Sequence, residues 1–256
     1  MQGPALAMLP RARPATLGGV IVVIGALGLR GTIDEPAPDG LAPEIAAAAA
    51  AAGARVELIS KAGDDPAGDA VLIALARAGV GHVATLRDPA RLTPVRALPN
   101  EPTDPADPAL DDAVQGSADN ESETEPQAPS PPSPGDRDPA LNTDPAVDTD
   151  PTLDAADVAL ALEYLTDFEV LVAVHASPEL LAEAISAARY SGARLVVVVP
   201  QESDVPSGVP ADALVVAAAA DDAEGVGPRI GRYAAALSRG DDAAAAYRDL
   251  TAVPTG

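Results

Sequence analysis

Short apolar runs alternate along this chain with alanine-rich segments, most of which end at glycine. Strands are predicted from the apolar runs at 20–24, 55–60, 82–86, 169–174, 194–199 and 213–216. Helices are predicted between them at 44–52, 67–78, 154–165 and 178–190, with a final pair within 228–250 that Gly240 interrupts. The central strands lack polar alternation, which is typical of strands covered on both faces. The order therefore predicts an α/β fold: a doubly wound, mostly parallel sheet with helices on both faces.

The core of such a sheet must be built from aliphatic side chains. Apolar residues make up 47% of the 256 residues, but aromatic residues only 2%, and the sequence has no Trp. Valine, leucine, isoleucine and alanine are sufficient, because dense interior packing does not require rings. The sequence also has no cysteine, which excludes disulfides and thiolate–zinc sites.

Residues 99–152 interrupt this pattern. Twelve prolines recur there, Asp-Pro-Ala occurs four times, and acidic or small polar residues fill the gaps. From 100 to 157 there are sixteen Asp or Glu and one Arg, which gives −15 of the formal net charge of −23. This composition buries too little apolar surface to offset the entropy of ordering. We therefore predict a flexible N-terminus at 1–16, one part of the α/β domain at 17–98, a disordered insertion at 99–152 and the second part at 153–256.

The strong negative charge bears on partners and location. It disfavours nucleic acid and anionic membranes, because their phosphates repel an acidic protein. Arg11 and Arg13, followed by the apolar run 17–29, imitate a targeting signal. That run contains four glycines and is shorter than the roughly 20 residues that cross a bilayer. A cytoplasmic protein is expected, with a protein partner or a second copy of the chain as its partner.

The segment from Gly53 to Asp69 carries the most specific motif. It reads Gly-Ala-Arg-Val-Glu-Leu-Ile-Ser-Lys-Ala-Gly-Asp-Asp-Pro-Ala-Gly-Asp, in which a strand leads into a G-x-D-x-x-G turn. Asp65 is the predicted N-cap of the next helix and Pro66 its first residue. The segment and its flanking strands resemble the ribokinase (PfkB) family of carbohydrate kinases. The resemblance implies a ribokinase-like fold, here incomplete at the C-terminus, and ATP-dependent phosphoryl transfer to a sugar or similar alcohol.

The resemblance also implies where a sugar would bind, and this chain departs from the family there. Family members carry an Asn and then an Asp after the first strand, where this chain has Gly28 and Arg30. A guanidinium only donates hydrogen bonds, so it does not replace a carboxylate that accepts them from hydroxyls. The family's Gly-Gly pair and the following Asn correspond to Asp39-Gly40 and Glu44. Arg30, Gly40 and Glu44 are therefore predicted to be degenerate remnants of a substrate-binding site.

The nucleotide side departs from the family as well. The family's Asn-Glu motif is replaced by 217–220, and Asp221 and Asp222 just beyond are the candidates for cofactor binding. The family's Gly-Ala-Gly-Asp anion hole ends in the catalytic base. Here Gly225-Val-Gly227 continues with Pro228, so no counterpart of that motif and no catalytic residue is predicted.

These departures predict a PfkB-like protein that is catalytically inactive, a pseudokinase that acts as a ligand-binding or regulatory partner protein. The sugar lid is expected to be reduced to 32–39 and, after Thr93-Pro94, replaced by the insertion. No metal or cofactor is predicted, and ATP with Mg²⁺ would bind only if activity were retained. One alternative is an active ATP-dependent sugar or nucleoside kinase with atypical site residues. Another is an inert fold whose acidic insertion captures a basic partner.

Two further patterns near strand ends have plain structural interpretations. Gly25, Gly28 and Gly31 are spaced G-x-x-G-x-x-G, unlike a dinucleotide fingerprint, and are interpreted as a glycine-rich strand exit. Of the two histidines, His82 is predicted to begin a strand. His175 is predicted to follow a strand at its carboxyl end; lining a remnant cleft there is the alternative, and the sequence identifies no partner for it.

The last pattern is a set of aspartates before the predicted helix at 154–165. Asp148, Asp150, Asp154 and Asp157 partly resemble a calcium-binding repeat, because alternate oxygen ligands suit Ca²⁺. The loop glycine is missing, so a capped helix after an acidic linker is the favoured interpretation. Lys61, the only lysine, is predicted to be solvated.

Overall fold

The computed structural model describes residues 19–96, 150–165, 167–219 and 225–251. All of them belong to one unit of the chain, which comprises 1–98 and 150–256. The predicted flexible N-terminus at 1–16 and residues 99–149 of the predicted insertion lie outside the described residues.

A parallel β-sheet forms the centre of the described unit. Its strand order is β10-β9-β8-β1-β4-β5, and β6 also pairs with β4. Every pairing in it is parallel. The strands are β1 (Val20–Ile24), β4 (Arg55–Gly63), β5 (Val80–Gly81), β6 (Thr85–Asp88), β8 (Phe168–Val174), β9 (Arg194–Pro200) and β10 (Leu214–Ala218).

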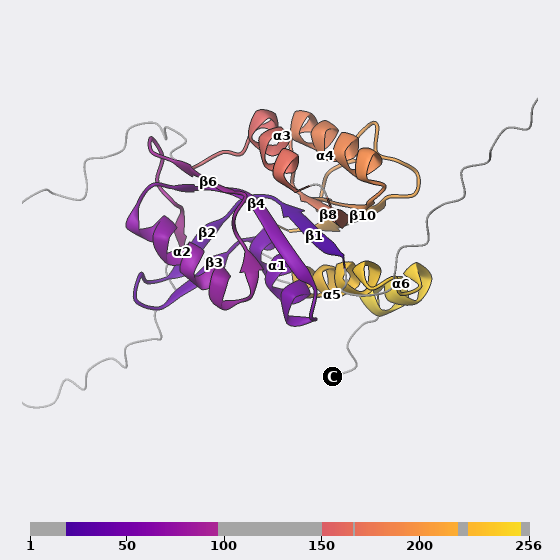
Figure 1. Cartoon of the computed structure of the whole chain (residues 1–256), viewed down its shortest axis with the longest axis horizontal. Helices are drawn as coiled ribbons and strands as arrows, with labels where there is room; N and C mark the ends of the chain where they lie inside the picture. The colour runs from indigo at the N-terminus through magenta and orange to yellow at the C-terminus, as the bar shows by residue number, and fades with distance from the viewer. Residues whose placement is uncertain (1–18, 97–149, 166, 220–224, 252–256) are drawn as a thin grey trace, which may run out of the picture. The chain divides into compact units, whose positions relative to one another are not determined.

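Helices cover both faces of this sheet, as Figure 1 shows. One face packs against α1 (Leu41–Ala51), α2 (Pro66–Arg77), α5 (Val226–Ser238) and α6 (Ala243–Thr251). The other packs against α3 (Ala155–Tyr164) and α4 (Pro178–Ser191). The predicted doubly wound, mostly parallel α/β fold is therefore confirmed.

The central strand explains why its sequence shows no polar alternation. Ile21 and Val23 of β1 point to the face covered by α1 and α5, whereas Val22 and Ile24 point to the face covered by α3 and α4. All four side chains are fully buried. A strand covered on both faces must be apolar throughout, so a continuous apolar run is its signature.

A second, three-stranded sheet lies outside the parallel one. Its order is β3 (Pro36–Asp39), β2 (Gly28–Gly31), β7 (Val95–Arg96), with an antiparallel β2–β3 pair and a parallel β2–β7 pair. The Leu29 N–H also donates to the Pro94 carbonyl at 2.8 Å. None of these strands was predicted. The stretch 32–39, expected to be a reduced remnant of a lid, supplies one strand of an ordered sheet.

The predicted strand at 82–86 exists but begins three residues later, and the prediction that His82 begins it is wrong. β5 ends at Gly81, His82 lies outside any strand, and β6 begins only at Thr85. β5 pairs with the start of β4, whereas β6 pairs with its end, at Ser60–Gly63. A turn lies between β5 and β6, closed by a 3.0 Å hydrogen bond from the Thr85 N–H to the His82 carbonyl. This turn moves the pairing partner from the start of β4 to its end.

The helix boundaries follow the predicted capping residues. Asp65 caps α2, with Pro66 in the first turn, and Asp154 forms a reciprocal capping box with Asp157 at α3. Gly192 adopts the left-handed conformation directly after α4, at φ 70°, which L-residues other than glycine rarely occupy. None of the helices in the described ranges is long and apolar enough to cross a bilayer.

Candidate functional site

The candidate site lies where the parallel strands end, the edge at which open α/β sheets bind their ligands. β1 leaves the sheet through Gly25, whose N–H donates to the Ile59 carbonyl at 3.2 Å. The buried Ser60 hydroxyl donates to the Gly25 carbonyl at 2.7 Å. A Cβ at Gly25 would lie 2.7 Å from the Ala42 Cβ, so only glycine fits. β2, not a helix, follows this exit, which confirms the strand-exit interpretation and excludes the dinucleotide fingerprint.

The three residues predicted as substrate-site remnants come together at this edge. Arg30 lies on β2 and Glu44 in the first turn of α1, and Arg30 Nη1 lies 3.5 Å from Glu44 Oε1. Gly40 precedes α1 at φ 113°, and its carbonyl accepts from the Glu44 N–H at 3.2 Å. The two side chains remain 41% and 24% exposed. The arrangement is a partly solvated ion pair beside the small sheet.

A second ion pair ties the small sheet together, and it was not predicted from the sequence. Asp39, at the end of β3, lies 3.2 Å from Arg96 Nε on β7. The Asp39 side chain is only 14% exposed, so the guanidinium compensates a mostly buried carboxylate. The sequence did not predict this ion pair because β3 and β7 lie on either side of β2 in space but far apart along the chain.

A helix N-terminus lies at the same edge of the sheet. The C-terminal end of α5 meets the start of β1, where Gly19 N–H donates to the Ser238 carbonyl at 3.2 Å. α5 therefore runs antiparallel to the strands, and its first turn lies at their carboxyl ends. A Cβ at Gly231 would lie 2.5 Å from the Ile45 carbonyl, so α5 and α1 pack closely with their N-termini side by side.

The first turn of α5 contains a proline. Gly225 is the N-cap at φ 65°, and Val226, Gly227 and Pro228 follow. A helix N-terminus offers unpaired N–H groups to an anion, but Pro228 has no N–H to contribute. α5 thus begins within Gly225-Val-Gly227, and proline follows where an acidic residue would complete the family's motif. Asp221 and Asp222 lie outside the described residues.

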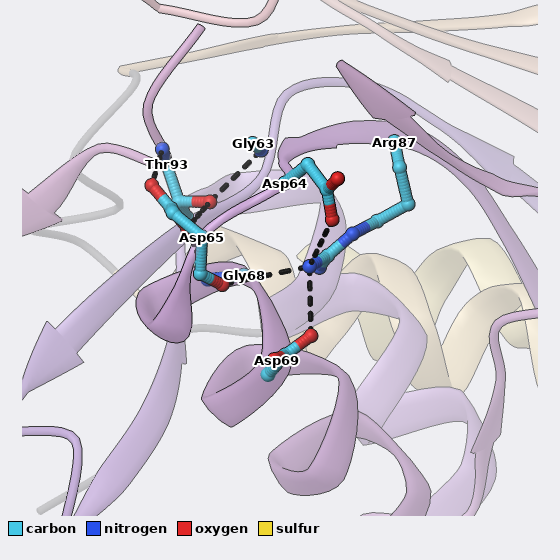
Figure 2. A network of polar contacts seen from close by, with 7 residues as sticks. All are labelled: Gly63, Asp64, Asp65, Gly68, Asp69, Arg87 and Thr93. Atoms are coloured by element: carbon cyan, nitrogen blue, oxygen red, sulfur yellow. Dashed lines mark hydrogen bonds and ion pairs between the residues drawn. The ribbon is translucent and has the colours of Figure 1, made fainter. Parts of the chain in front are cut away.

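The G-x-D-x-x-G turn is organised around Asp65 (Figure 2). Asp65 Oδ1 accepts from the Gly68 N–H at 2.7 Å and from the Thr93 hydroxyl at 2.9 Å, and Oδ2 accepts from the Thr93 N–H at 2.8 Å. The Thr93 hydroxyl oxygen in turn accepts from the Gly63 N–H at 2.9 Å. Thr93 is buried, and the carbonyl of the next residue, Pro94, accepts a hydrogen bond from the Leu29 N–H of β2. The network therefore connects the start of α2 to the small sheet.

Electrostatics strengthen the same turn. Burial alone would raise the pKa of the Asp65 carboxyl, but hydrogen bonds from Gly68 and Thr93, with the nearby Arg87 charge, outweigh it and lower that pKa. Arg87 Nη2 lies 2.7 Å from Asp69 Oδ1 and 3.3 Å from Asp64 Oδ1 (Figure 2). The motif's polar atoms hold the turn, so its role in this chain is structural.

Lys61 forms a contact that contradicts its predicted solvation. Its Nζ lies 2.8 Å from Asp157 Oδ2, with the two side chains 18% and 19% exposed. The hydrogen bond to Asp157 raises the pKa of Lys61. The pair joins the carboxyl end of β4 to the first turn of α3. Asp157 therefore binds Lys61 and also forms part of the capping box. Within the described ranges no cluster of three metal-ligating side chains occurs.

His175 directly follows β8, as predicted, but its imidazole ring contacts the backbone at the end of a neighbouring strand. It is the only non-glycine residue of the described ranges with positive φ, at 47°. Its N–H donates to the Val198 carbonyl at 2.9 Å, and Nε2 lies 3.1 Å from the Ala218 carbonyl. The residue therefore links the ends of β8, β9 and β10.

This arrangement, a parallel sheet with helices on both faces and a small outer sheet, is an α/β fold that solved structures share. Among solved structures, Sa239 is similar with a TM-score of 0.53 and 12% identity over 90% of each chain. A putative ribokinase from Agrobacterium tumefaciens is similar with a TM-score of 0.49 and 15% identity, over 90% of this chain and 87% of that one.

A third similar structure is an uncharacterized sugar kinase from Pyrococcus horikoshii, with a TM-score of 0.43 and 15% identity. The match covers 70% of this chain, which spans about half (52%) of that kinase. No protein-family model and no curated protein matches the sequence. At 12% identity the likeness to Sa239 is one of fold alone.

Proposed function

We propose that this chain is a ribokinase-like protein that no longer transfers phosphoryl groups and acts by binding a ligand or a protein partner. The observation that carries the proposal is the first turn of α5. In the family that this chain resembles, the residue after the Gly-x-Gly pair is the acidic base. Here that residue is Pro228, which accepts no proton from a hydroxyl and lacks an N–H for an anion.

The sugar side supports the same conclusion. Arg30 stands where the family carries a carboxylate, and Glu44 stands where it carries an asparagine. The two side chains pair with each other at 3.5 Å. A hydroxyl-rich ligand that entered here would have to compete with this ion pair. An anionic group would suit Arg30 better, because a guanidinium donates and never accepts.

Within the described ranges no cluster of three metal-ligating side chains occurs. Beside a bound ATP, one or two carboxylates together with phosphate oxygens would be enough to hold Mg²⁺. The two carboxylates predicted for that role, Asp221 and Asp222, lie outside the described residues. The proposal includes no metal-assisted step, because it includes no phosphoryl transfer. It places the protein in the cytoplasm, with a small ligand, a protein partner or a second copy as its target.

Binding and turnover, measured separately on the full chain, test the proposal. Calorimetry with a panel of sugars, nucleosides and sugar acids, with and without ATP and Mg²⁺, reports binding, and ADP release reports turnover. We expect at least one ligand to bind without turnover, and Glu44→Gln to change its affinity severalfold. Glu35→Gln, which alters an exposed carboxylate on the neighbouring loop, is the matched control and should change nothing. Sugar-dependent ADP release that disappears in Asp221→Asn or Asp222→Asn would instead establish an active kinase.

A further inference from the structure

A cavity of about 730 Å³ lies on the side of α5 that faces α6 and the end of α1. Figure 1 shows α5 and α6 side by side in yellow. The lining includes Arg229, Arg232, Tyr233 and Arg239 of α5 and its C-cap, together with Ala246 and Leu250 of α6. The cavity shares no residue with the Arg30–Glu44 pair. Its volume falls within the roughly 300–1,000 Å³ typical of small-molecule sites.

The cavity concentrates positive charge in a protein whose formal net charge is −23. Arg229, Arg232 and Arg239 are three and seven residues apart, so they project from one face of the helix. Among the described residues of the lining Asp241 is the one acidic residue, and its Oδ2 lies 3.0 Å from Arg239 Nη2. Neither Arg229 nor Arg232 forms an ion pair with another residue that the structure describes. Two guanidiniums therefore remain available to a ligand.

The floor of the cavity is apolar. Tyr233 is 8% exposed, and Ala246 and Leu250 are 7% and 8% exposed. Burial raises the pKa of Tyr233, which keeps its phenol neutral over the physiological range. Tyr233 also lines a neighbouring cavity of about 470 Å³, which brings in Arg189 and Arg194. The two cavities together hold five of the chain's sixteen basic side chains around one aromatic ring.

We propose that this cavity binds an organic phosphate. The guanidiniums of Arg229 and Arg232 donate to the phosphate oxygens, a geometry in which Arg surpasses Lys because its planar fork forms two parallel hydrogen bonds. The Tyr233 ring and the methyl groups of α6 contact the organic body of the ligand. A purely apolar ligand would leave the arginines without partners, and inorganic phosphate would leave the apolar floor uncovered. The inference is independent of the function proposed for the sheet edge.

Phenyl phosphate, phenol and inorganic phosphate titrated into the full chain at 50 mM NaCl test this inference. Phenyl phosphate should bind with 1:1 stoichiometry, more tightly than inorganic phosphate, and more weakly at 300 mM NaCl because salt screens the charges. Phenol should not bind measurably. In Arg229→Gln/Arg232→Gln the affinity for phenyl phosphate should fall at least tenfold. Arg248→Gln, an exposed α6 residue outside the lining, should change it less than twofold.

The inference is overturned if phenyl phosphate does not bind, if phenol binds equally well, or if the double variant retains the wild-type affinity. It is also overturned if an Asp/Glu-rich peptide, and not phenyl phosphate, binds through the two arginines, because the cavity would then be a protein-docking site. Glu44→Gln should leave the affinity for phenyl phosphate unchanged. Failure here is therefore distinguishable from failure of the function proposed for the sheet edge.

Discussion

Replacing Asp65 by alanine tests whether the G-x-D-x-x-G turn is structural. The change removes the N-cap of α2, which costs about 1 kcal/mol. It also leaves the Thr93 N–H and hydroxyl without their acceptors, at about 1 kcal/mol each for hydrogen bonds of this kind. We therefore expect Asp65→Ala to lower the free energy of unfolding by about 3 kcal/mol.

The assay is urea denaturation followed by circular dichroism at the helix band, because the chain has no Trp for fluorescence. A loss of stability should lower the midpoint without changing the slope. Asp64→Ala is the matched control in the same turn. Its carboxylate is 63% exposed, so we expect a cost below about 0.5 kcal/mol. If Asp65→Ala costs under about 1 kcal/mol by this assay, or if Asp64→Ala costs as much, the structural role is refuted.

The pH dependence provides a second readout of the same carboxylate. Its pKa in the folded protein is lowered from the usual 3.8. A lowered folded pKa stabilises the protein above the unfolded value, and this contribution is lost as the pH falls through the folded value. The difference in stability between wild type and Asp65→Asn should therefore be constant near neutrality and shrink below pH 3.8. A difference that grows on acidification would contradict the assignment.

Two further predictions concern packing and charge. Lys61→Met should lower the free energy of unfolding by about 1–2 kcal/mol, because it leaves Asp157 without its charged donor. Since the folded pKa of Lys61 is raised above 10.5, the difference from wild type should persist at neutral pH and shrink above pH 10.5, and a constant difference would contradict the pair. Gly231→Ala should cost about 1–3 kcal/mol, because the new Cβ meets the α1 backbone at Ile45. Arg232→Ala, at the exposed neighbouring position, should cost little, and equal effects of the two changes in thermal unfolding would rule out close helix contact as the cause.

The parallel sheet and its helices were predictable because their signals are local. Apolar runs such as Val20–Ile24 identify strands covered on both faces, and Asp65 and Asp154 cap helices through bonds to residues only three positions away. Each signal lies within a few residues of the element it determines.

The small sheet was not predictable for the opposite reason. β3 reads Pro-Ala-Pro-Asp, which carries two strand-breaking prolines, and β7 has only two residues. These strands exist because β2 pairs with both and because Leu29 donates to Pro94, a contact between distant parts of the chain. Lys61 was misread for the same reason, since its partner lies 96 residues away.

The candidate site was located by resemblance more than by chemistry. Arg30, Gly40 and Glu44 were selected by matching a family pattern, and the structure brings them together. The Asp39–Arg96 pair required the fold to be found. No sequence motif indicates the arginines that line the α5 cavity. They are related only because they lie on one face of the helix, beside the same cavity.

The most direct test of the central claim is phosphoryl transfer at enzyme concentrations equal to substrate. The full chain is incubated with γ-labelled ATP, Mg²⁺ and the panel of sugars and nucleosides, and labelled product is separated from ATP. The account predicts no labelled sugar or nucleoside above the protein-free background, because Gly225-Val-Gly227 is followed by Pro228, whose side chain cannot act as a base. Stoichiometric transfer of label to any one of these alcohols would contradict it.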